Sequence, residues 1–88
     1  MPAQRIMITG KVQGVFFRAY VQEHALPLRI TGWVRNCPDG SVEIHAEGTS
    51  ESLQQLEHLC IRGPRAARVD KIDVQEASGE GCTGFTIL

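Results

Sequence analysis

Hydrophobic and polar residues alternate in four segments of the chain, which is the pattern of half-buried β-strands. The first is residues 5–12, with Ile6, Ile8 and Val12 on one face. Residues 30–35 and 41–46 also have strand character and are separated by Asn, Pro, Asp and Gly, so they predict a hairpin. Residues 69–75 resume the alternation, and the change of phase after Val69 predicts a β-bulge or a late start of this strand.

Two other segments have the periodicity of amphipathic helices. From Phe17, apolar or aromatic residues recur three or four positions apart, and Pro27 should end this helix near Leu26 because its ring disfavours helical geometry in the preceding residue. Thr49 or Ser50 can cap a second helix, which the Gly-Pro pair at residues 63–64 terminates. The sequence therefore predicts helices that alternate with the strands.

The order of these elements is strand, helix, strand, strand, helix, strand, followed by a glycine-rich loop at residues 78–84 and a short last strand that includes Phe85 and Ile87. This order predicts an α+β, ferredoxin-like βαββαβ fold, an antiparallel sheet with two helices on one face. In that fold the first two strands run parallel with one strand between them, and their carboxyl ends share one edge of the sheet. We therefore expect residues 13–18 and Asn36 to converge.

Length and charge narrow the class of protein. With 88 residues, of which 42% are hydrophobic, we expect a single domain spanning residues 1–88. Nine Lys and Arg against ten Asp and Glu give a net charge of -1, which lacks the basic field of a dedicated nucleic-acid binder. The chain shows neither a long apolar run nor a signal peptide. We expect a cytoplasmic monomer that binds neither nucleic acid nor membranes.

The histidines and cysteines do not show the spacing of a metal site. His45 is expected on the outer face of the sheet, and no histidine is paired with a cysteine or carboxylate at a recognised spacing. The three cysteines match neither a zinc pair nor a disulfide framework, and we expect reduced thiols whose role the sequence leaves open; they are Cys37, Cys60 and Cys82. No metal ligand is assigned.

Residues 10–18 lead from a strand through glycines directly into the start of a helix. Amide N–H groups at a helix N-terminus lack internal partners and carry partial positive charge, so such a turn can bind a phosphate, and Gly14 lets the chain bend closely around it. Arg18 in the first turn opposes the helix dipole unless an anion sits there. On these residues alone, a solvated arginine beside an ordinary turn is the favoured interpretation.

Four sequence blocks resemble the acylphosphatase family. They are VQGVFFR at residues 12–18, GWVRN at 32–36, DGSVE at 39–43 and GPRAARV at 63–69, in the order and spacing of that family. The resemblance runs from about Ile6 to Ile87. It implies a ferredoxin-like fold and hydrolysis of the carboxyl-phosphate anhydride of small acyl phosphates to a carboxylate and inorganic phosphate, without a metal or cofactor.

The resemblance also implies roles for particular residues. The family's phosphate-binding arginine falls on Arg18, and its water-positioning asparagine falls on Asn36. The phosphate cradle falls on the backbone N–H groups of Gly14, Val15, Phe16, Phe17 and Arg18. An amide can orient a water by accepting one of its protons, while N–H groups and a guanidinium stabilise phosphoryl charge. Inorganic phosphate is the expected product and a competitive inhibitor.

Two alternatives remain beside this interpretation. One is an acylphosphatase-like domain acting on carbamoyl phosphate, as in the large hydrogenase maturation factors, although those proteins continue into zinc-binding and further domains and this chain ends at Leu88. The other is a non-enzymatic anion- or nucleic-acid-binding module of ferredoxin-like fold. The pair Arg18 and Asn36 favours the enzyme, because a module that only binds an anion has no use for a water-orienting amide.

Overall fold

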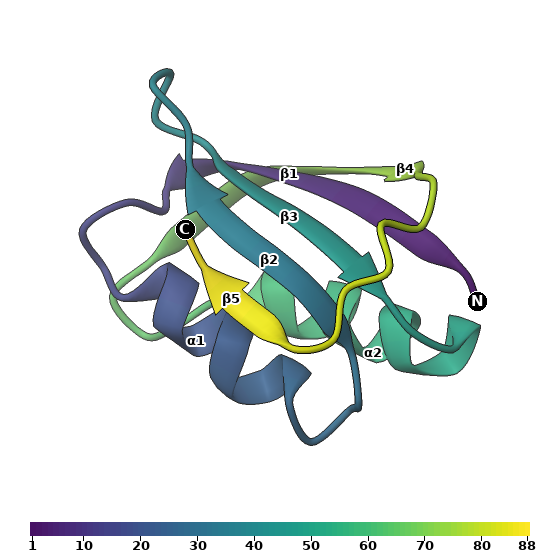
Figure 1. Ribbon diagram of the computed structural model, residues 1–88. Coiled ribbons are helices and arrows are strands. Elements are labelled where there is room, and N and C mark those ends of the chain that lie inside the picture. Colours follow the sequence, from purple (N-terminus) through teal and green to yellow (C-terminus); the bar gives the residue numbers. More distant parts are fainter.

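The computed structural model describes all 88 residues, which form one five-stranded sheet with two helices on one of its faces (Figure 1). The elements are β1 (Ala3–Lys11), α1 (Phe17–Ala25), β2 (Thr31–Asn36), β3 (Val42–Glu47), α2 (Ser50–Arg62), β4 (Arg68–Glu76) and β5 (Phe85–Ile87). The strand order is β4-β1-β3-β2-β5. The ferredoxin-like fold is confirmed, and the short β5 makes the sheet mixed because it pairs parallel with β2.

Strand β3 is the centre of this sheet. It pairs antiparallel with β1 on one side and with β2 on the other, and Ile44 lies opposite both Ile6 and Val34. Strands β1 and β2 therefore run parallel with one strand between them, as predicted. Their carboxyl ends lie at the same edge of the sheet (Figure 1).

The predicted irregularity after Val69 is a β-bulge. Thr9 pairs with Lys71, but Gly10 pairs with Val69, so Asp70 has no partner on β1. The extra residue shifts the alternation by one position, which lets Val69 pack against the core together with Ile72 and Val74 further along β4. This explains why the apolar positions of that segment change phase.

The two helices begin in different ways. Helix α2 has the capping predicted for it: the Thr49 side chain accepts a hydrogen bond from the Ser52 N–H at 3.1 Å, and Glu51 lies in the first turn. Helix α1 ends at Ala25, one residue before the predicted end, and has no side-chain cap at its start. The Tyr20 hydroxyl donates to the backbone carbonyl of Leu59 at 2.7 Å, which joins the two helices.

The core lies between the helices and the inner face of the sheet. Its side chains come from alternate strand positions and from one stripe of each helix, among them Ile6, Ile8, Phe17, Val21, Val34, Val42, Ile44, Leu53, Leu56 and Cys60. Burial raises the pKa of the Cys60 thiol to about 12, so this cysteine stays protonated inside the core. No helix of the chain is long and apolar enough to cross a membrane.

The outer face of the sheet is polar, yet part of it is buried. Glu43 lies on this face, and the guanidinium groups of Arg5 and Arg35 each contact its carboxylate at 2.6 Å. Burial raises the pKa of Glu43, but the hydrogen bonds from the two arginines outweigh it, so the net shift is downward. Residues 77–84, between β4 and β5, pass over the neighbouring part of this face (Figure 1).

A glycine in β2 is required where two strands approach closely. Gly32 has φ 145°, and a Cβ at this position would overlap the carbonyl oxygen of His45 on β3. We predict that Gly32→Ala lowers the free energy of unfolding by about 3 kcal/mol, because strain at positive φ adds to a clash with the central strand. Urea unfolding followed by Trp33 fluorescence measures the loss.

Gly40 provides the matched control. It also has a positive φ, 94°, but a Cβ there would meet no atom within 4 Å. Gly40→Ala should therefore cost only the backbone strain, about 1 kcal/mol. Equal losses in the two variants would contradict the close approach of β2 and β3 as the reason for Gly32.

Candidate active site

The turn between β1 and α1 has an unusual backbone. Gly14 has φ 73° and Phe16 has φ 64°, so two residues of this short turn adopt the left-handed conformation. That conformation is strained for an aromatic residue, and such strain tends to occur at functional sites. The side chain of Phe16 is 83% exposed, so burial does not offset the strain. The turn keeps a costly shape that packing alone does not explain.

The backbone N–H groups of this turn have no partners in the chain. No N–H from Gly14 to Arg18 donates a hydrogen bond to a backbone or side-chain acceptor, and α1 has no acidic residue in its first turn. Helix α2, in contrast, has both a capping threonine and Glu51. The N-terminus of α1 is therefore open to an anion, which its unpaired donors and the helix dipole would stabilise.

A pocket of about 280 Å³ lies beside this turn. Its lining residues are Val12, Gly14, Phe16, Phe17, Arg18, Ala19, Asn36 and Ile87. The structure thus brings the turn and the end of β2 together, and their predicted convergence is confirmed. Of the candidate residues, only Val15 does not line the pocket, because its side chain is buried in the core.

Arg18 is positioned by the end of the chain. Its Nη1 donates to the backbone oxygen of Leu88 at 3.0 Å, and the Leu88 N–H donates in turn to the Val34 carbonyl at 2.9 Å. The other guanidinium nitrogens donate to no protein acceptor, and the side chain is only half-buried. Free donors of a guanidinium beside unpaired backbone N–H groups form a site that suits a phosphate.

Gln13 is a residue whose role the sequence analysis missed. Its Nε2 donates to the carbonyls of Cys37 and Ser41 at 2.8 and 2.9 Å, which ties the turn to the hairpin that follows Asn36. These bonds fix the turn relative to the asparagine. The VQGVFFR block contains this glutamine, but nothing local indicated that its amide reaches the β2–β3 hairpin.

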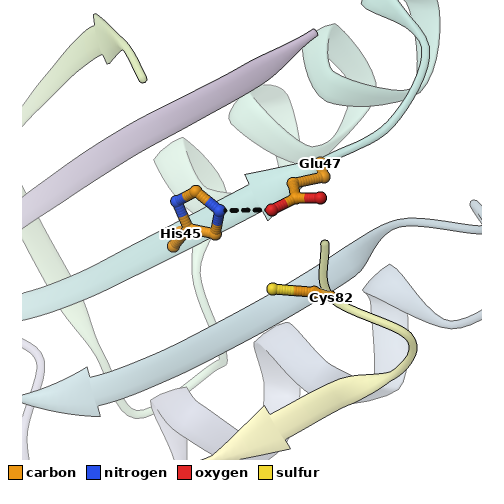
Figure 2. A group of neighbouring side chains, drawn as sticks. All are labelled: His45, Glu47 and Cys82. Carbon is orange, nitrogen blue, oxygen red and sulfur yellow. Dashed lines mark hydrogen bonds and ion pairs between the residues drawn. The ribbon is translucent and has the colours of Figure 1, made fainter. Parts of the chain in front are cut away.

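His45 lies on the outer face of the sheet, as predicted. On the outer face of the sheet His45 is grouped with Glu47 and Cys82, and its Nε2 lies 2.7 Å from a carboxylate oxygen of Glu47 (Figure 2). None of the three lines the pocket beside Arg18. The spacing of these three residues in the sequence did not indicate a group, because Cys82 comes from the loop before β5.

Two members of this group, Glu47 and Cys82, have shifted pKa values. The backbone N–H of Glu80, followed by His45, lowers the pKa of the Glu47 carboxyl to about 2. Burial and the neighbouring carboxylates of Glu47 and Glu80 raise the pKa of the Cys82 thiol. Together these residues form a polar cluster on the outer face of the sheet, separate from the pocket beside Arg18.

Comparison with known proteins identifies the family. The model of the acylphosphatase family matches residues 4–87. An acylphosphatase of Rhizorhabdus wittichii is 49% identical over 84 residues, which cover 96% of this chain and 85% of that protein. The crystal structure of acylphosphatase from Bacillus subtilis is 42% identical with a TM-score of 0.97, covering 100% of this chain and 99% of the other.

A larger protein contains a similar part. HypF of T. kodakarensis is 33% identical with a TM-score of 0.86, and the match covers 100% of this chain but 12% of that one.

The fold and the pocket define a ferredoxin-like α+β protein with a pocket at one edge of its sheet, between the turn after β1 and the end of β2. The chain belongs to the acylphosphatase family, and it is an enzyme of that type, a hydrolase.

The bridge made by Gln13 can be tested by replacing it with an apolar side chain of similar length. We predict that Gln13→Met lowers turnover of benzoyl phosphate roughly tenfold, because the turn is no longer fixed relative to Asn36. The lost hydrogen bonds should lower the free energy of unfolding by about 1–2 kcal/mol. Steady-state kinetics and urea unfolding measure both.

Gln55→Met, on the exposed side of α2, is the control and should leave turnover unchanged. Wild-type turnover in Gln13→Met would show that the bridge does not position the site.

Proposed function

We propose that this pocket hydrolyses the carboxyl-phosphate bond of small acyl phosphates, with Arg18 and the turn binding the phosphate and Asn36 orienting the attacking water. One observation carries the proposal: the unpaired N–H groups of the turn, the partly free guanidinium of Arg18 and the amide of Asn36 belong to residues around one pocket of about 280 Å³.

Binding of the phosphate follows from charge and hydrogen bonding. The N–H groups of Gly14, Val15, Phe16, Phe17 and Arg18 supply backbone donors, and the helix dipole adds partial positive charge. The Arg18 guanidinium supplies a full positive charge and can donate two parallel bonds to phosphoryl oxygens. These groups stabilise the charge on the equatorial oxygens in the transition state.

The chemical step needs no ionisable base from the protein. The carbonyl oxygen of the Asn36 amide accepts a hydrogen bond from a water and holds it for attack on phosphorus. The new bond from water oxygen to phosphorus forms as the bond from phosphorus to the acyl oxygen breaks, and the carboxylate leaves with the electron pair. The proton of the water passes to a phosphoryl oxygen of the substrate. Catalysis then consists of positioning and electrostatic stabilisation.

The acyl group meets few specific contacts. Outside the phosphate-binding groups, the pocket offers the apolar side chains of Val12, Phe16 and Ile87. We infer that the enzyme accepts a range of small acyl groups, because the phosphate provides most of the recognition. The cytoplasmic location, the monomeric state and competitive inhibition by inorganic phosphate stay predictions.

Two substitutions separate phosphate binding from water positioning. Arg18→Ala should abolish detectable phosphate binding and lower turnover of benzoyl phosphate about 1000-fold, because it removes the only side-chain cation of the pocket. Asn36→Ala should keep phosphate affinity within about twofold and lower turnover about 100-fold. Kinetics in the presence of EDTA and competition by inorganic phosphate measure the two effects.

Arg65→Ala, in the exposed loop after α2, is the control and should keep wild-type kinetics. Wild-type rates in both Arg18→Ala and Asn36→Ala would overturn the assigned site. Absence of turnover in a wild-type protein shown to be folded by Trp33 fluorescence would instead favour the anion-binding module.

A further inference from the structure

Three side chains of different chemical type meet on the outer face of the sheet, on the opposite side from the helices. The ligand atoms of His45, Glu47 and Cys82 all lie within 4.8 Å of one another, and none of these residues lines the active-site pocket. We propose that this cluster binds a divalent transition-metal ion of the zinc class. The active-site chemistry proposed above does not use it.

The donor set selects the kind of metal. One imidazole nitrogen, one carboxylate oxygen and one thiolate sulfur suit Zn²⁺ and its near neighbours, whereas Mg²⁺ and Ca²⁺ require oxygen ligands throughout. Three protein ligands leave the fourth tetrahedral position to a water. Binding replaces the proton of the Cys82 thiol by the metal, and that proton passes to the solvent.

The strand presents two of the ligands together. His45 and Glu47 are two positions apart on β3 and therefore point to the same face, with Nε2 and Oε2 2.7 Å apart. Two such ligands on a tetrahedral metal are about 3.3 Å apart for bonds of ~2.0–2.1 Å. Small side-chain rotations therefore open enough space. Figure 2 shows Cys82 on the loop that crosses this face, with its sulfur directed toward the other two side chains.

The surroundings are those of a constructed site. His45 is only 4% exposed, and a carboxylate oxygen of Glu80 lies 3.8 Å from its Nδ1. The other oxygen of Glu80 accepts a hydrogen bond from the indole N–H of Trp33 at 3.0 Å. A carboxylate behind a ligating histidine holds the proton on the far nitrogen and leaves the near one free for the metal. The Glu80 oxygen is beyond hydrogen-bond distance of Nδ1 as it stands, and a small movement of its side chain toward His45 would give it this role.

The backbone adds one more contact. The N–H of Glu80 donates to Oε2 of Glu47 at 2.6 Å, which holds residues 77–84 against β3 even without a metal. A bound ion would strengthen the attachment of this loop to β3, because its ligands would come from both the loop and the strand. Because β5 directly follows this loop, metal binding should raise the melting temperature of the protein in proportion to the logarithm of metal concentration.

The test titrates reduced, metal-free protein with Zn²⁺ and, separately, with Co²⁺. We expect one Zn²⁺ per chain by calorimetry, and a near-ultraviolet charge-transfer band with Co²⁺ that reports a cobalt–thiolate bond. Cys82→Ser should remove the band and weaken Zn²⁺ binding at least about 100-fold. Glu80→Gln, which removes the carboxylate charge beside His45 but keeps an oxygen that can accept from Trp33, should weaken binding about tenfold.

Cys37→Ser is the matched control, because Cys37 is also a partly exposed free thiol and lies outside the cluster. It should keep both the band and the affinity. Cys82 lies in a loop, so Cys82→Ser should fold, which Trp33 fluorescence and turnover of benzoyl phosphate verify.

Two results would overturn the proposal. One is a wild-type protein that takes up no Zn²⁺ and gives no cobalt–thiolate band, in which case the cluster only anchors the loop through hydrogen bonds. The other is equal binding by Cys82→Ser and the wild type. Both readouts are independent of catalysis, so failure of the proposed hydrolysis would leave this test intact.

Discussion

Strand β3 pairs with β1 on one side and β2 on the other, and this double pairing positions both the pocket beside Arg18 and the cluster of His45, Glu47 and Cys82. It makes β1 and β2 parallel, so the turn after β1 and Asn36 at the end of β2 reach the same pocket. Its inner side chains, Val42 and Ile44, are part of the core beneath the helices. Its outer side chains include His45 and Glu47, which form the polar cluster together with Cys82. The close approach that admits only glycine at position 32 belongs to the same pairing.

The proposed catalytic function explains features of α1 that are unfavourable for stability. A strained Phe16, an uncapped N-terminus and a cation in the first turn each cost free energy in an isolated helix. Helix α2 avoids all of these costs by the ordinary means, a capping threonine and an acidic first turn. The contrast within one small chain agrees with the proposal that the start of α1 binds a phosphate. Binding of a phosphate would satisfy the unpaired N–H groups and offset the charge of Arg18.

The outer face of the sheet illustrates a different constraint. Two helices cover only one face, so the other must be stabilised by polar pairs and by the chain itself. Arg5 and Arg35 neutralise Glu43. Residues 77–84 pass beside His45 and are held there by the hydrogen bonds of Glu80 with Trp33 and Glu47. This covering buries a histidine beside a carboxylate and a thiol. The loop that covers this face of the sheet thereby brings together the three side chains of the proposed metal site.

The sequence by itself determined the order of elements, the caps of α2, the bulge near Val69 and the convergence of residues 13–18 with Asn36. These features follow from short-range alternation, from local turn chemistry and from the parallel arrangement of β1 and β2. Only the tertiary structure decided that the amide of Gln13 reaches the hairpin and that Cys82 meets His45. Both contacts join segments far apart in the sequence, and each depends on the path of a turn or loop that has no periodicity. Such a path is set by the sum of many long-range contacts, which leave no mark on the neighbouring residues in the sequence.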